Sequence, residues 1–117
     1  MRLRTAREQM LAIARERDFQ QQIVDAARWL GWLVYHVFDS RRSEPGFPDL
    51  VMVHPRQRRV LFVELKSETG RLRPEQLIWL GALMSCPGVE AYVWRPGDVD
   101  EAMALLEGSG ERCDATS

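Results

Sequence analysis

Two carboxylates and one lysine near the middle of the chain are the residues whose types and spacing could do chemistry. Asp49, Glu64 and Lys66 all lie in the stretch GFPDLVMVHPRQRRVLFVELK, at residues 46–66. Carboxylate oxygens are ligands that hard divalent cations such as Mg²⁺ prefer, and one or two carboxylates commonly hold such an ion. Lys66 is the one lysine beside fifteen arginines. Because lysine is a compact cationic donor that can position or activate a water molecule, its presence here is informative.

A β-hairpin is predicted to bring the two carboxylates together. Apolar runs at residues 50–54 and 60–65 flank a segment at 55–58 whose proline and polar residues are typical of a turn. With the turn centred on its two middle residues, Asp49 lies opposite Glu64, and strand alternation puts the lysine on the same face. The apolar residues of that face, which we expect to be buried, are Val51, Val53, Val60 and Phe62.

The carboxylate pair has a structural as well as a catalytic interpretation. An aspartate before a strand is ordinary turn chemistry, and Glu64 and Lys66, two positions apart on a strand, can form a solvated pair. However, like charges directly opposite one another in a sheet are unfavourable, and burial would favour the protonated form of one of them. A bound divalent cation removes that conflict. The predicted pairing of Asp49 with Glu64 therefore favours a metal site.

Several blocks beyond this motif resemble a known family. In chain order they read GWLVYHVFDSRRSEPGFPDLVMV, FVELKSETGRLRPEQLIWL and VEAYVWRPGDVDE. Their order and approximate spacing are similar to those of small stand-alone VRR-NUC domains, which belong to the PD-(D/E)XK nuclease superfamily. The resemblance covers about residues 16–103. It implies an α/β, restriction-endonuclease-like core, with a mixed four-stranded sheet flanked by helices, and metal-dependent hydrolysis of DNA.

The same resemblance implies roles for individual residues. The implied catalytic residues are Asp49, Glu64, Lys66 and Gln76. The implied ligands of Mg²⁺ or Mn²⁺ are Glu16, Asp49, Glu64 and the backbone carbonyl of Leu65. Without the resemblance, Glu16 would be interpreted as a surface residue paired with a nearby arginine, and Gln76 as an exposed helix residue. No nucleotide cofactor is implied.

The elements that must position these residues are also visible in the sequence. Helix formers and arginines fill residues 1–30, which predicts one long helix or two abutting helices ending at Gly31. A buried stripe at helical spacing consists of Phe19, Ile23, Ala26, Ala27 and Leu30. The arginines lie mostly off that stripe, so a solvated helix face is their simplest interpretation, although together they could contact phosphates. These arginines are Arg2, Arg4, Arg7, Arg15, Arg17 and Arg28.

The rest of the chain predicts a small α/β domain. Residues 32–38 read as a strand that is apolar on both faces and hence central or covered. A helix opens at Pro74, and a strand at residues 89–94 follows it, so this strand is expected to run parallel to residues 60–65. A final short helix covers residues 102–106. The predicted order is αβββαβα, with a basic helical extension (1–15), a nuclease domain (16–107) and a flexible tail (108–117).

Composition limits the classes of function. The chain is 45% hydrophobic and 28% charged, which suits a single globular domain with a small core. Its net charge of −1 excludes a histone-like polycation, so contacts with nucleic acid must come from local basic clusters. We expect a cytoplasmic protein, or one in the bacterial host cytoplasm if it is phage-encoded, with no membrane association. The predicted DNA-binding residues, in two polar loops, are Arg41, Arg42, Arg71 and Arg73.

Small members of the resembling family suggest an endonuclease that resolves Holliday junctions. Symmetric cutting of a four-way junction needs two active sites, which predicts a two-fold homodimer. Candidate dimer surfaces are the N-terminal helix and some of the four tryptophans, two of which we expect in the core. These tryptophans are Trp29, Trp32, Trp79 and Trp94. The alternatives are a flap or nicking nuclease without junction preference, and a non-catalytic DNA-binding protein that keeps the fold.

Overall fold

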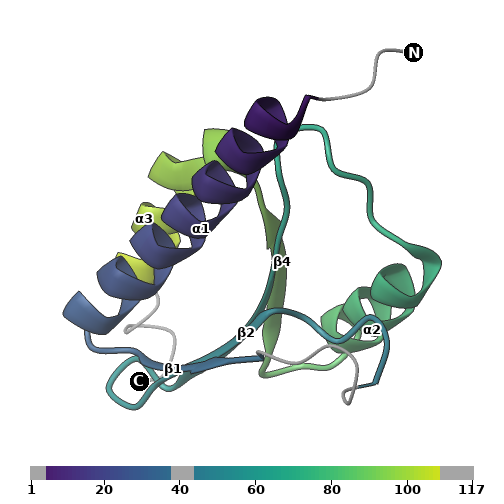
Figure 1. Cartoon of the computed structure of the whole chain (residues 1–117). Coiled ribbons are helices and arrows are strands. Elements are labelled where there is room, and N and C mark those ends of the chain that lie inside the picture. Colours follow the sequence, from purple (N-terminus) through teal and green to yellow (C-terminus); the bar gives the residue numbers. More distant parts are fainter. Residues whose placement is uncertain (1–4, 38–43, 109–117) are drawn as a thin grey trace.

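A computed structural model describes residues 5–37 and 44–108, and in it a four-stranded sheet carries helices on both faces (Figure 1). The elements are α1 (Ala6–Trp29), β1 (Leu33–His36), β2 (Leu50–His54), β3 (Arg59–Leu65), α2 (Pro74–Met84), β4 (Glu90–Trp94), a 3₁₀ helix η1 (Pro96–Asp98) and α3 (Val99–Glu107). The predicted order αβββαβα is confirmed, with η1 inserted before the last helix.

The sheet is mixed, with the strand order β1-β2-β3-β4. The β2–β3 hairpin is antiparallel, and its register is the predicted one: Val53 pairs with Val60 and Val51 with Phe62. β4 runs parallel to β3, as expected for two strands separated by a helix. The hairpin register therefore brings the start of β2 to the end of β3, where the candidate chemistry lies.

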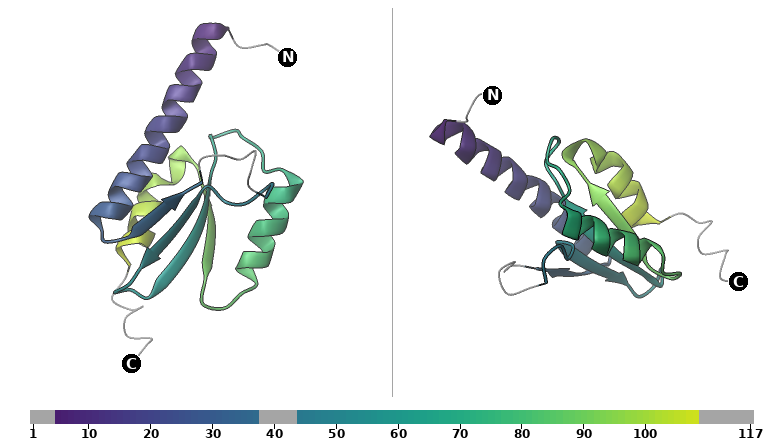
Figure 2. Two further views of the ribbon diagram at one scale, coloured as in Figure 1. Left: turned by 60° about the horizontal axis from the view of Figure 1, so that its bottom comes forward. Right: turned by 90° about the vertical axis from the view of Figure 1, so that its right-hand side faces the viewer.

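The main core lies between the sheet and the α1–α3 layer. Leu50, Met52, Leu61 and Val63 point toward these helices and are fully buried. The predicted stripe of α1 is confirmed at Phe19, Ile23 and Ala27, which pack into the same cluster. This apolar layer packs the last three turns of α1 onto the sheet. The earlier turns of the helix extend past the sheet edge (Figure 2).

The predicted burial of the opposite face of the hairpin is wrong. Val51, Val60 and Phe62 are half-buried there, and Val53 is 36% exposed. Two helices cover the first face, whereas α2 covers the second face on the side of β4 (Figure 1). Strand alternation indicates which residues share a face, but the helix docking decides which face becomes the core.

The strand predicted at residues 32–38 is shorter and less covered than expected. β1 is an edge strand whose partner is β2, and its side chains Leu33 and Tyr35 are 65% and 67% exposed. The interpretation of a central or covered strand is therefore wrong. Of the tryptophans, Trp32 and Trp94 are buried, Trp79 is half-buried against Phe47, and Trp29 is 88% exposed.

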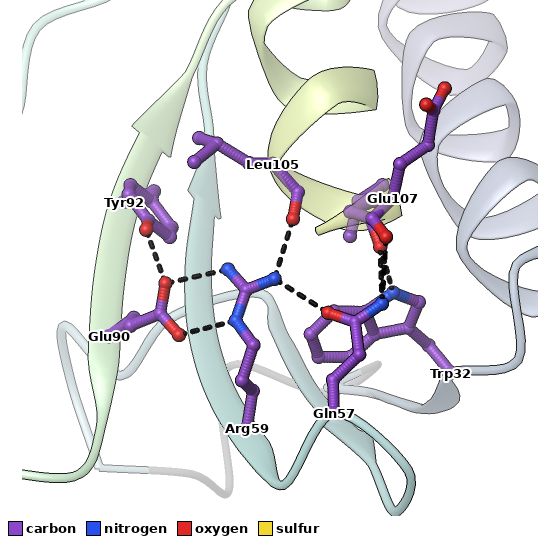
Figure 3. A network of polar contacts seen from close by, with 8 residues as sticks. Trp32, Gln57, Arg59, Glu90, Tyr92, Leu105 and Glu107 are labelled. Atoms are coloured by element: carbon purple, nitrogen blue, oxygen red, sulfur yellow. Dashed lines mark hydrogen bonds and ion pairs between the residues drawn. The ribbon is translucent and has the colours of Figure 1, made fainter. Parts of the chain in front are cut away.

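A buried polar network joins the far end of the hairpin to α3 (Figure 3). The Arg59 guanidinium donates two hydrogen bonds of 2.7 Å to the Glu90 carboxylate, and Nη1 donates at 2.7 Å to the Leu105 carbonyl. Gln57 Nε2 and Trp32 Nε1 both donate to the Leu106 carbonyl. The network ties the end of the last helix to two strands, so the sheet end opposite the candidate site is held by directional bonds as well as by packing.

Helix α1 runs without a break across residues 15 and 16, where the predicted extension meets the predicted domain. That boundary stays a prediction. In the described part of the chain, no helix combines the length and apolar character needed to cross a membrane.

Candidate active site

A cavity of about 550 Å³ opens between α1 and the loop that follows β3. The loop wall consists of residues 67–71, and Pro96 also lines the cavity. Asp49, Leu65 and Lys66 line the floor. The α1 wall consists of Ala12, Arg15, Glu16, Phe19 and Gln20. Three of the predicted metal ligands, Glu16, Asp49 and Leu65, therefore face one space.

The hairpin positions Asp49 beside the end of β3. Asp49 Oδ2 accepts a hydrogen bond of 2.8 Å from the backbone N–H of Leu65. This bond holds the carboxylate one residue before the strand pairing begins, next to Glu64. The structure thus brings the two predicted carboxylates to the same end of the hairpin.

Glu64 is buried and incompletely satisfied. Its side chain is 4% exposed, and Oε2 accepts a hydrogen bond of 2.9 Å from Gln76 Nε2 and lies 3.6 Å from Lys66 Nζ. The other oxygen, Oε1, is buried with no hydrogen-bond partner. Burial of the carboxylate is the main effect that raises the pKa of Glu64, and the negative charge of Asp49 raises it further. The positive charge of Lys66 lowers it in part, and the resulting pKa is about 7.

This donor set fits a hard divalent cation. A buried carboxylate oxygen without a partner is costly, and an ion ligated by it would remove both that cost and the repulsion from Asp49. Glu16 faces the cavity from α1 but is exposed. Within residues 5–37 and 44–108, no three His, Cys, Asp or Glu side chains form a ready-made cluster. Ligation by Glu16 therefore stays a prediction.

The raised pKa of Glu64 has a measurable consequence for stability. The unfolded chain binds this proton with a pKa near the ordinary 4.5, and the folded protein with a pKa of about 7. The folded state therefore binds more protons between these values, and without metal the free energy of unfolding should fall as pH rises from about 4.5 to 7. The unfolding free energy of the Glu64→Gln variant is subtracted from that of the wild type at each pH. The difference isolates the contribution of Glu64, which we expect to change by a few kcal/mol over this range.

Chemical denaturation at several pH values measures the effect, with exposed Glu101→Gln as the matched control. The difference between wild type and the control should stay flat over this window. Added Mg²⁺ should reverse the trend for the wild type, because metal binding releases the proton of Glu64. A wild-type minus Glu64→Gln difference that does not change with pH would contradict a buried, proton-binding Glu64.

Gln76 is held at both ends of its amide. Pro74 opens α2, and Gln76, two residues on, accepts a hydrogen bond of 2.8 Å from the backbone N–H of Arg73 while its Nε2 donates to Glu64. Gln76 is 5% exposed, so the interpretation as an exposed helix residue does not apply. The amide orients the Glu64 carboxylate and leaves Oε1 available for another ligand.

Arg95 is a positioning residue that the sequence did not reveal. Its Nη1 donates hydrogen bonds of 2.6 Å and 2.7 Å to the carbonyls of Ser67 and Gly70. Glu68 accepts a bond from the backbone N–H of Gly97, and Ser67 Oγ accepts one from Gly70. The cavity loop is thus fixed to the segment after β4. The contacts that Arg95 and Glu68 make across the chain span 25 to 29 residues, so no local pattern could have indicated them.

The predicted DNA-binding arginines have different surroundings. Arg71 lines the cavity. Arg73 is exposed at the start of α2 and does not line it. Arg41 and Arg42 lie outside the described residues.

A family comparison identifies the fold that carries this site. The sequence model of the VRR-NUC domain matches residues 3–96 of the chain. The chain belongs to the VRR-NUC domain family. The chain accordingly has the PD-(D/E)XK fold of this family, a fold that generally uses divalent metal ions.

Individual relatives agree with this assignment. A solved structure titled VRR_NUC domain is 29% identical, with a TM-score of 0.59 over 74% of this chain and 90% of that one. The Fanconi-associated nuclease 1 homolog of Caenorhabditis elegans is 42% identical over 53 residues, and that of Schizosaccharomyces pombe is 36% identical over 47 residues. These matches cover 45% and 40% of this chain but 6% and 7% of the relatives. The VRR-NUC domain described here thus corresponds to a small part of those proteins.

Proposed function

We propose that this VRR-NUC domain is a metal-dependent endonuclease that hydrolyses DNA phosphodiesters at branched structures, and that it resolves Holliday junctions as a two-fold homodimer. The observation that carries the proposal is the buried, unpartnered Oε1 of Glu64 beside Asp49 and Lys66. A purely structural domain gains nothing from that arrangement, because it lowers stability unless a cation binds. The names of the relatives, both nucleases, support cleavage chemistry.

The residues have distinct roles in the proposed reaction. Asp49, Glu64, Glu16 and the Leu65 carbonyl would hold Mg²⁺ or Mn²⁺. When bound, such an ion supplies Lewis-acid chemistry and neutralises negative charge on the phosphate. Lys66 lines the cavity, where its ammonium donates to the attacking water or to a phosphate oxygen. Gln76 keeps Glu64 in the ligating orientation.

The dimer is proposed because one domain provides one such site and a symmetric junction needs two. Leu33 and Tyr35 are exposed on the sheet face turned away from α1, where they pair with Val53 and Val51, and they offer an apolar surface for a second copy. Light scattering of the purified protein tests the dimer independently of cleavage.

Cleavage of labelled DNA tests the proposal directly. Four-way junction, flap and linear duplex are incubated with and without Mg²⁺ or Mn²⁺, and we expect paired symmetric nicks on the junction that require metal. Lys66→Ala should lower the rate about 10²-fold because a positioned proton donor is lost, and exposed Arg56→Ala is the control. Cleavage of flaps or duplex as fast as junctions would replace junction resolution by a flap or nicking activity. Binding without cleavage would support the non-catalytic alternative.

A further inference from the structure

The N-terminal helix contributes a cationic residue to the cavity wall. Arg15 lines the cavity from α1, and it lies four residues before Phe19 and eight before Ile23. Residues four apart share a helix face, so Arg15 continues the face that is buried further along. The residues of α1 in the core cluster begin at Phe19, whereas Arg15, one turn earlier, lines the candidate site. Arg15 is therefore an exposed helix residue that also faces the candidate site.

The opposite wall carries a second cation, Arg71. The residue before it, Gly70, donates its N–H to Ser67 Oγ and its carbonyl accepts from Arg95, so the backbone leading to Arg71 is fixed. In the part of the chain that the structure describes, the side chains of Arg15 and Arg71 make no hydrogen bond or ion pair. Both guanidinium groups are exposed and available to an anion that enters the cavity.

Both walls of the cavity carry an arginine. Arg15 adjoins Glu16 on α1, Arg71 follows Glu68 by three residues on the opposite loop, and the carboxylate of Asp49 lies between the two walls. A single small anion would be repelled by the carboxylate of Asp49, and one arginine would be enough to bind it. A chain of phosphates that crosses the cavity meets an arginine on each side, while its middle phosphate lies over the acidic floor, where a divalent cation would offset the repulsion.

We propose that Arg15 and Arg71 bind phosphates of one nucleic-acid strand on the two sides of the position that is cut, an inference that rests on the proposed function because it takes the ligand to be DNA. The cavity volume of about 550 Å³ is in the range that holds a drug-sized ligand, which suits a short length of one strand rather than a duplex.

Salt-dependent binding tests the assignment without relying on cleavage. Fluorescence anisotropy of a labelled single strand is measured with Ca²⁺ over about 50–200 mM salt. Each lost phosphate contact should reduce the magnitude of the slope of log K against log salt by about 0.7. Arg15→Ala and Arg71→Ala should each show this reduction, and the double variant should show about twice as much. Arg15→Lys, which keeps the charge, should retain the slope.

Arg17→Ala and Arg56→Ala are the matched controls, because both residues are exposed and lie outside the cavity. They should leave the slope unchanged, and thermal denaturation should show all variants folded. An unchanged slope for Arg15→Ala, or an equal decrease for Arg17→Ala, would overturn the assignment. The two proposals can fail separately. If the wild type cuts DNA but binding does not depend on Arg15, only the assignment of Arg15 and Arg71 to phosphates is refuted. If binding depends on Arg15 but no DNA is cut, only the nuclease function is refuted.

Discussion

Asp49→Asn is expected to lower the rate of metal-dependent DNA cleavage by about 10³-fold or more. The substitution removes one of the two carboxylates that would hold the cation, and a bound metal typically contributes several kcal/mol to the stabilisation of such a transition state. The local fold should persist, because the amide oxygen of asparagine can still accept the hydrogen bond from the Leu65 N–H. Single-turnover cleavage of a labelled branched DNA in Mg²⁺ or Mn²⁺ measures the effect.

The same variant should not lose stability when metal is absent. The charge of Asp49 contributes to the raised pKa of Glu64, so its removal relieves repulsion between the two carboxylates. We therefore expect an unchanged or higher melting temperature together with the loss of activity. Asp100→Asn, at an exposed position of α3, should change neither quantity appreciably. If Asp49→Asn cuts DNA at the wild-type rate, Asp49 is not a metal ligand. If the variant is inactive because it is unfolded, Asp49 has a structural role instead.

Glu90→Ala is expected to reduce the free energy of unfolding by about 3–5 kcal/mol. Glu90 accepts two hydrogen bonds from Arg59, whose side chain is 3% exposed, so the substitution leaves a buried guanidinium without its carboxylate (Figure 3). Tyr92 also loses the Glu90 oxygen to which its hydroxyl donates. Domains of this size have total stabilities of about 5–15 kcal/mol, so the loss should be evident in urea or thermal denaturation.

A double variant separates the cost of an unpaired charge from the value of the pair. Arg59→Met with Glu90→Leu removes both charges and fills part of the space, and it should be clearly more stable than Glu90→Ala. Arg56→Ala, on the exposed side of the same hairpin turn, is expected to stay within about 0.5 kcal/mol of the wild type. A loss below about 1 kcal/mol for Glu90→Ala would show that water replaces the carboxylate and that the network contributes little.

The hairpin and its carboxylates could be predicted because the determining information is local. Alternating side chains, a turn segment at residues 55–58 and the pairing that follows from it place Asp49 and Glu64 at one end. The helix beginning at Pro74 and the parallel strand after it also follow from local rules about proline and about connections between strands. These features need no knowledge of how the helices dock.

The errors concern burial, which depends on the docking of distant elements. The face bearing Val51 and Val53 and the strand containing Tyr35 were expected to be covered, and they are partly exposed because α2 packs toward β4. The burial of Gln76 and the contacts of Arg95 have the same origin, since their partners lie 12 to 28 residues away in the chain.

The sequence by itself determined the order of the elements, the hairpin register and the identity of the acidic and basic residues at the candidate site. Only the tertiary structure decided that Glu64 has a buried oxygen without a partner, that the loop after β3 is fixed by Arg95, and that Arg15 and Arg71 face one cavity. The physical reason is that register and helix start are set by neighbouring residues, whereas burial, desolvation and the shape of a cavity arise when elements far apart in the chain pack together.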